Sequence, residues 1–180
     1  MTSLIDNGPH GENRRDFLHI ATGTLAATAL AATAWPLIDS MNPSADILSQ
    51  ASVEIDLSSL EPGQRITAKW RGQPIFIDRR TQATIQAVRS ESLADLKDLE
   101  TDEARAINPE YLVVIGVCTH LGCIPLGQAA NARRGNWGGW FCPCHGSHYD
   151  QSGRIRKGPA PKNLKVPPYI LSGDSQLIIG

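Results

Sequence analysis

Excess charge of either sign is missing from the sequence. The chain of 180 residues has 17 lysines and arginines against 18 aspartates and glutamates, a formal net charge of -1 at pH 7. This balance gives no electrostatic case for binding nucleic acid. No internal repeat of about 20 to 50 residues is visible, so a solenoid or a propeller is not indicated. A composition of 41% hydrophobic and 19% charged residues is typical of one globular domain with an additional segment.

Cysteine is absent outside one short stretch. All four cysteines lie between Cys118 and Cys144. The disulfide framework of a small secreted domain would spread its cysteines over the fold, whereas these are gathered together. Their clustering indicates a single site.

Aspartate, glutamate, lysine and arginine are absent from residues 17–38. A helix of this length would extend about 33 Å, enough to cross a bilayer core of about 30 Å. Arg14 and Arg15 precede the run and resemble a twin-arginine export signal. Cleavage at the small residues 32–34 is the alternative to an uncleaved anchor. We favour the anchor, because the apolar run continues through Trp35, which suits the membrane interface.

Changes in composition predict the segments of the chain. Asp39 and Asp46 follow the apolar run and the two arginines precede it, which places the N-terminus in the cytoplasm. The stretch after the run is rich in Ser, Asn, Pro and Ala and should bend. The predicted segments are a cytoplasmic tail over 1–13, a signal and transmembrane anchor over 14–38, a flexible linker over 39–52 and a soluble domain over 53–180.

The soluble domain has the pattern of a mostly β, antiparallel fold. Short runs rich in β-branched and aromatic residues are separated by turn residues. Two hairpins are expected, one around Gly72 and one around Gly173-Asp174, and a helix or helix with a loop is expected over 90–106. The expected strands are 53–57, 64–70, 74–78, 111–117, 140–141, 169–171 and 176–179.

Two blocks carry the chemistry, Cys118-Thr-His120-Leu-Gly-Cys123 and Cys142-Pro-Cys144-His145-Gly-Ser147. Each offers a thiolate and an imidazole within one turn, as Cys-x-His and Cys-x-x-His, with one cysteine left over. A two-iron, two-sulfide centre with mixed ligands requires this set. Two disulfides would suit an exported domain but leave the histidines unexplained. Structural zinc is a further alternative, although the Cys-x-Cys spacing does not suit its usual cysteine pairs.

Both blocks resemble the signature boxes of the Rieske iron-sulfur proteins. The likeness extends upstream through residues 69–72, downstream through 158–164, and to the twin-arginine anchor. It is greatest for the Rieske subunits of bacterial cytochrome bc complexes, the ubiquinol:cytochrome c oxidoreductases. The resemblance implies an antiparallel Rieske-type β domain with a small cluster-binding part at about 111–165, preceded by one transmembrane helix.

The resemblance implies one Rieske-type 2Fe-2S cluster as the cofactor. The implied iron ligands are Cys118 and Cys142 on one iron and His120 and His145 on the other. The two remaining cysteines, Cys123 and Cys144, are implied to form a disulfide that ties the two blocks together. In an exported domain these two thiols would otherwise lie free beside a redox centre.

Further family positions surround this cluster. Ser147 and Tyr149 resemble the residues that donate hydrogen bonds to its sulfurs and raise its potential. Leu121 would either form an exposed tip at the quinol pocket or pack within its own loop. A third loop, Gly158-Pro159-Ala160-Pro161, would shield the cluster.

Two neighbouring features have no place in this assignment. His148 is expected to lie near the site without binding iron, because both histidine positions are filled. Residues 131–139 contain Arg133-Arg134 and several glycines, and we expect a solvated excursion or a contact with a partner subunit.

Histidine ligands have two chemical consequences. Replacing two of four thiolates by neutral imidazoles brings the oxidised cluster from a charge of about -2 to about zero, so its potential rises into the range of about -150 to +300 mV. Each ligating imidazole also keeps one ring nitrogen free, and the pKa of that nitrogen depends on the oxidation state of the iron. Such a ligand can accept a proton together with an electron.

The implied function is electron transfer within a membrane enzyme. As a subunit of the quinol:cytochrome c oxidoreductase, the chain would accept an electron and a proton from ubiquinol through His120 and His145 and pass the electron to a c-type cytochrome. Its implied partners are the cytochrome b subunit, the c-type cytochrome subunit, ubiquinol and the membrane, in a dimeric complex. The head would lie in the periplasm on a single-pass anchor in the bacterial inner membrane. The alternative is a Rieske small subunit of an arsenite-oxidase-type or oxygenase electron-transfer system.

Overall fold

The computed structural model describes residues 13–44, 51–173 and 175–180, and the chain divides into two units, Met1–Ala45 and Asp46–Gly180. The predicted cytoplasmic tail, apart from Asn13, lies outside the described residues. So do 45–50 of the predicted linker and Asp174 of the last predicted turn. Each unit is described by itself.

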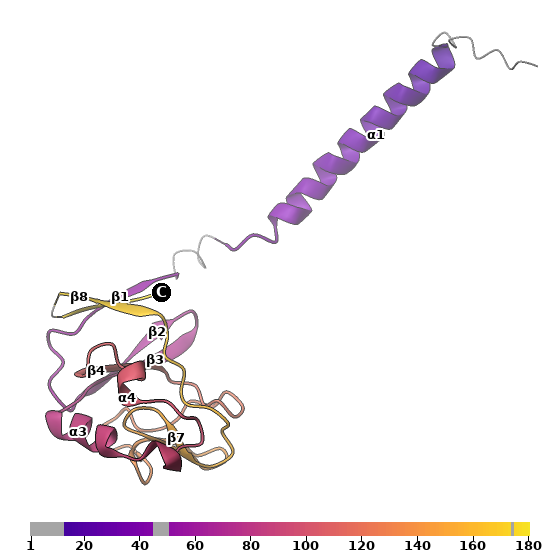
Figure 1. Cartoon of the computed structure of the whole chain (residues 1–180). Helices are drawn as coiled ribbons and strands as arrows, with labels where there is room; N and C mark the ends of the chain where they lie inside the picture. Colours follow the sequence, from indigo (N-terminus) through magenta and orange to yellow (C-terminus); the bar gives the residue numbers. More distant parts are fainter. Residues whose placement is uncertain (1–12, 45–50, 174) are drawn as a thin grey trace, which may run out of the picture. The chain divides into compact units, whose positions relative to one another are not determined.

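The first unit contains one long helix, α1 (Arg14–Asp39), shown in purple in Figure 1. At its start, the backbone N–H of Asn13 donates a hydrogen bond to the Asp16 carboxylate at 3.4 Å. Hydroxyl groups within the helix donate to the carbonyl four residues earlier, as Thr22 does to Leu18 at 2.7 Å, which satisfies them without water. Among the described residues, α1 is the one helix long and apolar enough to cross a membrane, judged by length and composition.

The described part of the second unit is built on three antiparallel sheets, with the strand orders β1-β9-β8, β2-β3-β4 and β5-β6-β7. The strands are β1 (Val53–Asp56), β2 (Arg65–Trp70), β3 (Gln73–Arg79), β4 (Tyr111–Ile115), β5 (Gly138–Cys142), β6 (Ser147–Asp150), β7 (Ile155–Lys157), β8 (Tyr169–Ser172) and β9 (Gln176–Ile179). Figure 1 shows β1 and β8 at one end of this unit, α3 and β7 at the other end, and β2, β3 and β4 between them. The prediction of a mostly antiparallel β domain after one apolar helix is confirmed.

The β2-β3-β4 sheet is covered on both faces, because successive side chains of a strand point to opposite sides. Ile77 and Val113 belong to a core that includes residues of β1, β8 and β9. Their neighbours Phe76 and Val114 belong to a second core, with residues of β5, β6 and β7. This explains the almost continuous apolar sequence of β4. The second core also contains Cys118, so packing of β4 fixes the start of the first cysteine block.

Of the two forms predicted for residues 90–106, a continuous helix is wrong, and a helix with a loop is nearer to the structure, because most of this range is not helical. The structure has a helix before it, α3 (Gln82–Ser90), then a single 3-10 turn, η1 (Leu93–Asp95), and the short α4 (Asp102–Arg105). The hydroxyl of Thr81 caps α3 by accepting the N–H of Thr84 at 3.2 Å, a signal present in the sequence. Between η1 and α4 the polar side chains bond to a distant loop, which local helix propensity does not reveal.

Candidate metal centre

The two cysteine blocks start from strands of different sheets. β4 ends at Ile115, shortly before Cys118, and Cys142 is the last residue of β5. A bridge joins Leu126 to Phe141, with an N–H to carbonyl bond in each direction, at 2.7 and 2.9 Å. Because Phe141 directly precedes Cys142, this bridge brings the end of the first block beside the second.

Both blocks contain the same kind of turn. The carbonyl of Cys118 accepts the N–H of Gly122 at 3.0 Å, and the carbonyl of Cys142 accepts the N–H of Gly146 at 3.0 Å. The two glycines have φ values of 83° and 73°, in the left-handed region that glycine adopts without steric cost. One histidine lies inside each turn, so the two imidazoles are presented by equivalent backbone elements.

The imidazole rings of His120 and His145 lie together, with centroids 4.6 Å apart and planes at 85°. The Nδ1 atom of His120 is buried and has no hydrogen-bond partner in the part of the chain that the structure describes. Buried polar atoms without a partner are rare in folded proteins. A metal ion bound at Nδ1 would satisfy this atom and leave Nε2 free to carry a proton.

Two of the cysteines are buried in the second core. Cys118 and Cys142 are each 2% exposed. Burial raises the pKa of Cys142 to about 12. Without a cation nearby this thiol therefore stays protonated, and metal binding would release its proton.

The other two cysteines lie further out. Cys123 is half-buried and Cys144 is exposed, and their Sγ atoms and that of Cys142 lie within 4.8 Å of one another. The four cysteines are free thiols in the structure, so the Cys123–Cys144 disulfide stays a prediction. The proximity of the two sulfurs is compatible with it.

Tyr149 and Ser147, both on β6, reach the two blocks. The Tyr149 hydroxyl donates to Cys118 Sγ at 3.2 Å. Burial raises the pKa of Tyr149, so its hydroxyl keeps the proton that it donates. Ser147 is 1% exposed, and its Oγ accepts the N–H of Ala160 at 3.2 Å, which leaves the hydroxyl hydrogen to another acceptor.

The predicted third loop lies directly against the second block. A Cβ atom at Gly158 would lie 2.5 Å from the Cα atom of Ser147, so no side chain fits there. Ala160 is 1% exposed, whereas Pro159 and Pro161 face outward. The loop therefore covers the block with its backbone and one small side chain.

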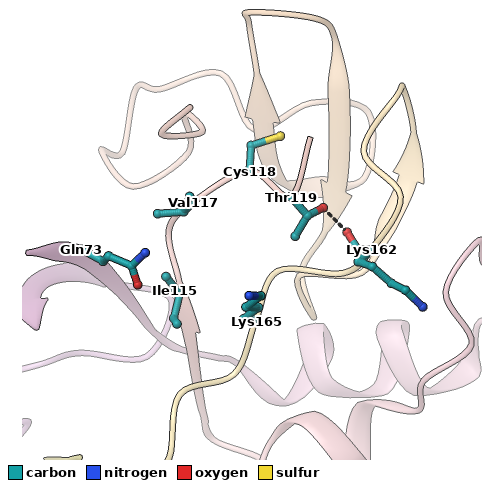
Figure 2. A pocket seen from close by; sticks show the side chains of 7 residues that line it. All are labelled: Gln73, Ile115, Val117, Cys118, Thr119, Lys162 and Lys165. Carbon is teal, nitrogen blue, oxygen red and sulfur yellow. Dashed lines mark hydrogen bonds between the residues drawn. The ribbon is translucent and has the colours of Figure 1, made fainter. Parts of the chain in front are cut away.

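Thr119, which the sequence did not single out, links the first block to the chain after the third loop. Its Oγ1 donates to the carbonyl of Lys162 at 2.6 Å, and its N–H donates to the Tyr149 hydroxyl at 3.3 Å. Figure 2 shows the bond between Thr119 and Lys162 at the edge of a cavity of about 340 Å³. The cavity is lined by Gln73, Ile115, Val117, Cys118, Thr119, Lys162 and Lys165.

Arg65 is a second residue that the sequence did not reveal. Its guanidinium pairs with Asp78 at 2.8 Å and donates to the carbonyls of Gly127 and Gly139, each at 2.9 Å. These two carbonyls lie after the first block and before the second. Arg65 thus holds both blocks to the β2-β3-β4 sheet. The two carbonyls lie more than sixty residues from Arg65 in the sequence, so no local pattern could indicate these bonds.

The excursion over 131–139 packs on the β5-β6-β7 sheet instead of extending into solvent. The guanidinium of Arg133 lies 4.0 Å from the centroid of the Phe141 ring. The N–H of Asn136 donates to Nδ1 of His148 at 3.2 Å, and burial lowers the pKa of His148. His148 therefore holds the excursion and lies near the blocks.

The donor set fits a two-iron, two-sulfide group with mixed ligands. Two buried thiols, two adjacent imidazoles, an unpartnered buried ring nitrogen and a hydroxyl bonded to a sulfur lie in one place. Soft thiolate ligands suit iron-sulfur clusters, and replacement of two of them by histidine is the feature of the Rieske type.

Comparison with known proteins agrees with this geometry. The family model described as "Rieske [2Fe-2S] domain" matches residues 52–168. A second model, described as "Ubiquitinol-cytochrome C reductase Fe-S subunit TAT signal", matches residues 6–44. This second match confirms the predicted twin-arginine signal.

Similar proteins cover most or all of the chain. The ubiquinol-cytochrome c reductase iron-sulfur subunit of Rhodospirillum rubrum is 55% identical over 96% of this chain and 94% of its own length. That of Rickettsia felis is 50% identical over the full length of both. A chain of a solved structure described as "Hyperthermophilic respiratory Complex III" has a TM-score of 0.51 and 28% identity, over 88% of this chain and 98% of its own. The chain therefore belongs to the Rieske [2Fe-2S] proteins, as an iron-sulfur subunit of the ubiquinol-cytochrome c reductase type, with a Rieske 2Fe-2S cluster as its cofactor.

Proposed function

We propose that this chain accepts one electron and one proton from ubiquinol at the quinol-oxidation site of its complex and passes the electron to a c-type cytochrome subunit. The observation that carries the proposal is the pair of imidazole rings, His120 and His145, 4.6 Å apart on two equivalent turns. His145 is exposed, so a hydrogen-bonding molecule can reach this edge of the site. Ubiquinol is named in the descriptions of the bacterial relatives.

We assign Cys118 and Cys142 to one iron and His120 and His145 to the other. When bound, the 2Fe-2S group takes up and returns one electron. The buried Nδ1 of His120 is the atom suited to hold iron, and Nε2 of the same ring is then the atom that holds or releases a proton. One such electron and proton together make half of the oxidation of a quinol.

The surface beside the histidines suits a protein partner. Leu121 directly follows His120 and is 70% exposed, and Ile124 on the same loop is 59% exposed. Exposed apolar side chains that lie close together indicate an interaction site. We propose that this apolar tip docks on the cytochrome b subunit and excludes water from the bound quinol, with Leu121 at the quinol pocket.

We further propose that α1 anchors the chain in the bacterial inner membrane, with the N-terminus in the cytoplasm and the head in the periplasm. The basic pair Arg14-Arg15 at the start of α1 supports this orientation by the positive-inside rule. A dimeric complex with the cytochrome b and c-type cytochrome subunits is the assembly that we expect.

Electron paramagnetic resonance of isolated membranes tests the function. Ascorbate-reduced membranes should show the signal of a reduced Rieske cluster, and addition of an inhibitor that occupies the quinol-oxidation site should shift this signal. An inhibitor specific for the quinone-reduction site is the control and should leave it unchanged. A cluster signal that neither inhibitor shifts would contradict docking at the quinol site.

A further inference from the structure

The segment 97–100, between η1 and α4, bonds to both ends of residues 158–163, which comprise the third loop and the two residues after it. Lys97 Nζ donates to the carbonyl of Gly158 at 2.5 Å. At the other end, Asp98 accepts the backbone N–H of Asn163 at 3.0 Å and the ammonium of Lys162 at 3.2 Å. The side-chain amide of Asn163 donates back to the carbonyl of Asp98 at 3.2 Å.

The opposite side of the same loop bonds to the two cysteine blocks. The N–H of Ala160 donates to Oγ of Ser147, and the carbonyl of Lys162 accepts the Oγ1 of Thr119. Figure 2 shows that the Lys162 side chain points away from Cys118, so only the backbone of this residue faces the block. Residues 158–163 therefore lie between the segment 97–100 and the cluster ligands.

Of these contacts, the bond between Asp98 and the Asn163 backbone is the firmest. The Lys162 side chain is 71% exposed, so its ion pair with Asp98 contributes little. Asn163 is 4% exposed, and its Oδ1 also accepts the N–H of Ile155 on β7 at 2.9 Å. The hydrogen bond from Asn163 holds the pKa of Asp98 below its ordinary value, so the carboxylate is charged at neutral pH. A charged acceptor makes this bond about twice as strong as a neutral one.

We propose that Asp98 is a positioning residue of the electron-transfer centre, because it holds the loop 158–163 against Ser147 and Thr119. The inference rests on the proposed function. Hydrogen bonds around the ligands tune the potential of a metal site, and their donors must be held in place to do so. In Asp98→Ala the backbone N–H of Asn163 loses its charged acceptor. The outer contacts that remain are Lys97, whose long side chain is exposed and costly to order, and the Asn163 side-chain amide, which bonds the carbonyl of residue 98 and the Glu100 carboxylate.

Asp98→Ala in the full membrane-bound complex tests this proposal. We expect the midpoint potential of the cluster to shift downward, because the loop no longer orients the Ser147 hydroxyl. Ser147→Ala, which removes this hydroxyl, should lower the potential as well. We also expect faster amide hydrogen exchange in residues 158–163. Asp95→Asn is the control for charge, since Asp95 is exposed and lies in the neighbouring turn. Removing a negative charge without moving the loop shifts the potential upward or leaves it unchanged.

A double variant shows whether Asp98 affects the cluster potential through Ser147 or independently of it. If Asp98 acts through the loop on Ser147, Asp98→Ala combined with Ser147→Ala should lower the potential no further than Ser147→Ala alone. Asp98→Asn replaces Asp98→Ala if that variant does not fold. Its neutral amide oxygen accepts the Asn163 N–H more weakly than the carboxylate does, so we expect a smaller downward shift of the potential. An upward or absent shift in Asp98→Ala or Asp98→Asn, with Ser147→Ala still lowering the potential, would overturn the role of Asp98 alone. Absence of any cluster signal in the parent protein would overturn the proposed function.

Discussion

The side chains of Arg80 and Asp102 form a fully buried ion pair, with Nη1 2.5 Å from Oδ1. Asp102 also accepts the hydroxyl of Ser152 at 2.6 Å and the Nε of Arg89 at 3.1 Å. The carboxylate therefore joins the end of β3, helix α3, helix α4 and the turn between β6 and β7.

Asp102→Asn should lower the free energy of unfolding by about 3–5 kcal/mol, because it leaves the Arg80 charge buried and unpaired. Urea unfolding followed by circular dichroism measures this change. Glu103→Gln is the matched control, since the Glu103 side chain is 58% exposed and pairs with Arg89 at the surface. We expect it to cost less than about 1 kcal/mol. Equal effects of the two substitutions would show that the buried pair does not stabilise the domain.

The same carboxylate predicts a pH dependence of stability. Burial alone would raise the pKa of Asp102, but the hydrogen bonds from Arg80 and Ser152 outweigh burial and hold it below its ordinary value. The charged carboxylate therefore contributes its full share of the free energy of unfolding above the unfolded-state pKa of about 3.9. This contribution is lost as the pH falls through the lower folded-state pKa. Below about pH 4, the parent protein should therefore lose more unfolding free energy per pH unit than Asp102→Asn. Parallel pH profiles would rule out this contribution.

Tyr149→Phe should lower the midpoint potential of the cluster. The substitution removes a hydroxyl that donates to Cys118 Sγ, and the sulfur then carries more electron density, which favours the oxidised state. A hydrogen bond worth about 1 kcal/mol corresponds to about 40 mV for a one-electron couple. Redox titration monitored by circular dichroism measures the shift. Tyr169→Phe is the control, since its hydroxyl accepts the N–H of Ile107 and touches no cysteine, and its potential should equal that of the parent.

Gly158→Ala should reduce the amount of cluster that the protein retains. Gly158 has a φ of 103°, and a Cβ there would lie 2.5 Å from Ser147 Cα, so the third loop would have to move off the second block. Iron content and visible absorption per mole of protein measure the loss. Gly72→Ala is the control: its φ of 76° imposes comparable backbone strain, but a Cβ there meets no atom within 4 Å. Full retention of iron in Gly158→Ala would show that this close contact is dispensable.

Local patterns predicted the parts of the fold that depend on neighbouring residues. The apolar run of β4 and the hairpin around Gly72 follow from β-branched residues and a turn glycine, and the structure has both. The two blocks were visible because thiols and imidazoles are rare and recur at short spacing. Asp98 and Arg65 were not, because their roles depend on carbonyls and N–H groups that every residue possesses and that lie more than sixty residues away. The pattern over 90–106 indicated a helix or a helix with a loop, and the structure has there a 3-10 turn, a loop and the short α4.

The remaining prediction concerns the disulfide between Cys123 and Cys144, whose sulfurs lie within 4.8 Å of each other. The proposed location of the head, the periplasm, is an oxidising compartment, where two adjacent thiols become oxidised. Alkylation of the denatured protein without reductant should label Cys118 and Cys142 after removal of iron, but not Cys123 or Cys144. Mass spectrometry should then find the peptides of the last two joined.

Replacing both cysteines by serine tests what this bond contributes. The double substitution should lower the free energy of unfolding by about 2–4 kcal/mol, because the unfolded chain gains the freedom that the cross-link removes. Since neither sulfur is assigned to iron, the freshly prepared variant should still show a Rieske-type spectrum but lose it faster on heating than the parent. Labelling of Cys123 and Cys144 without reductant would refute the disulfide, and complete absence of the spectrum in a folded variant would indicate that these sulfurs act on the cluster directly.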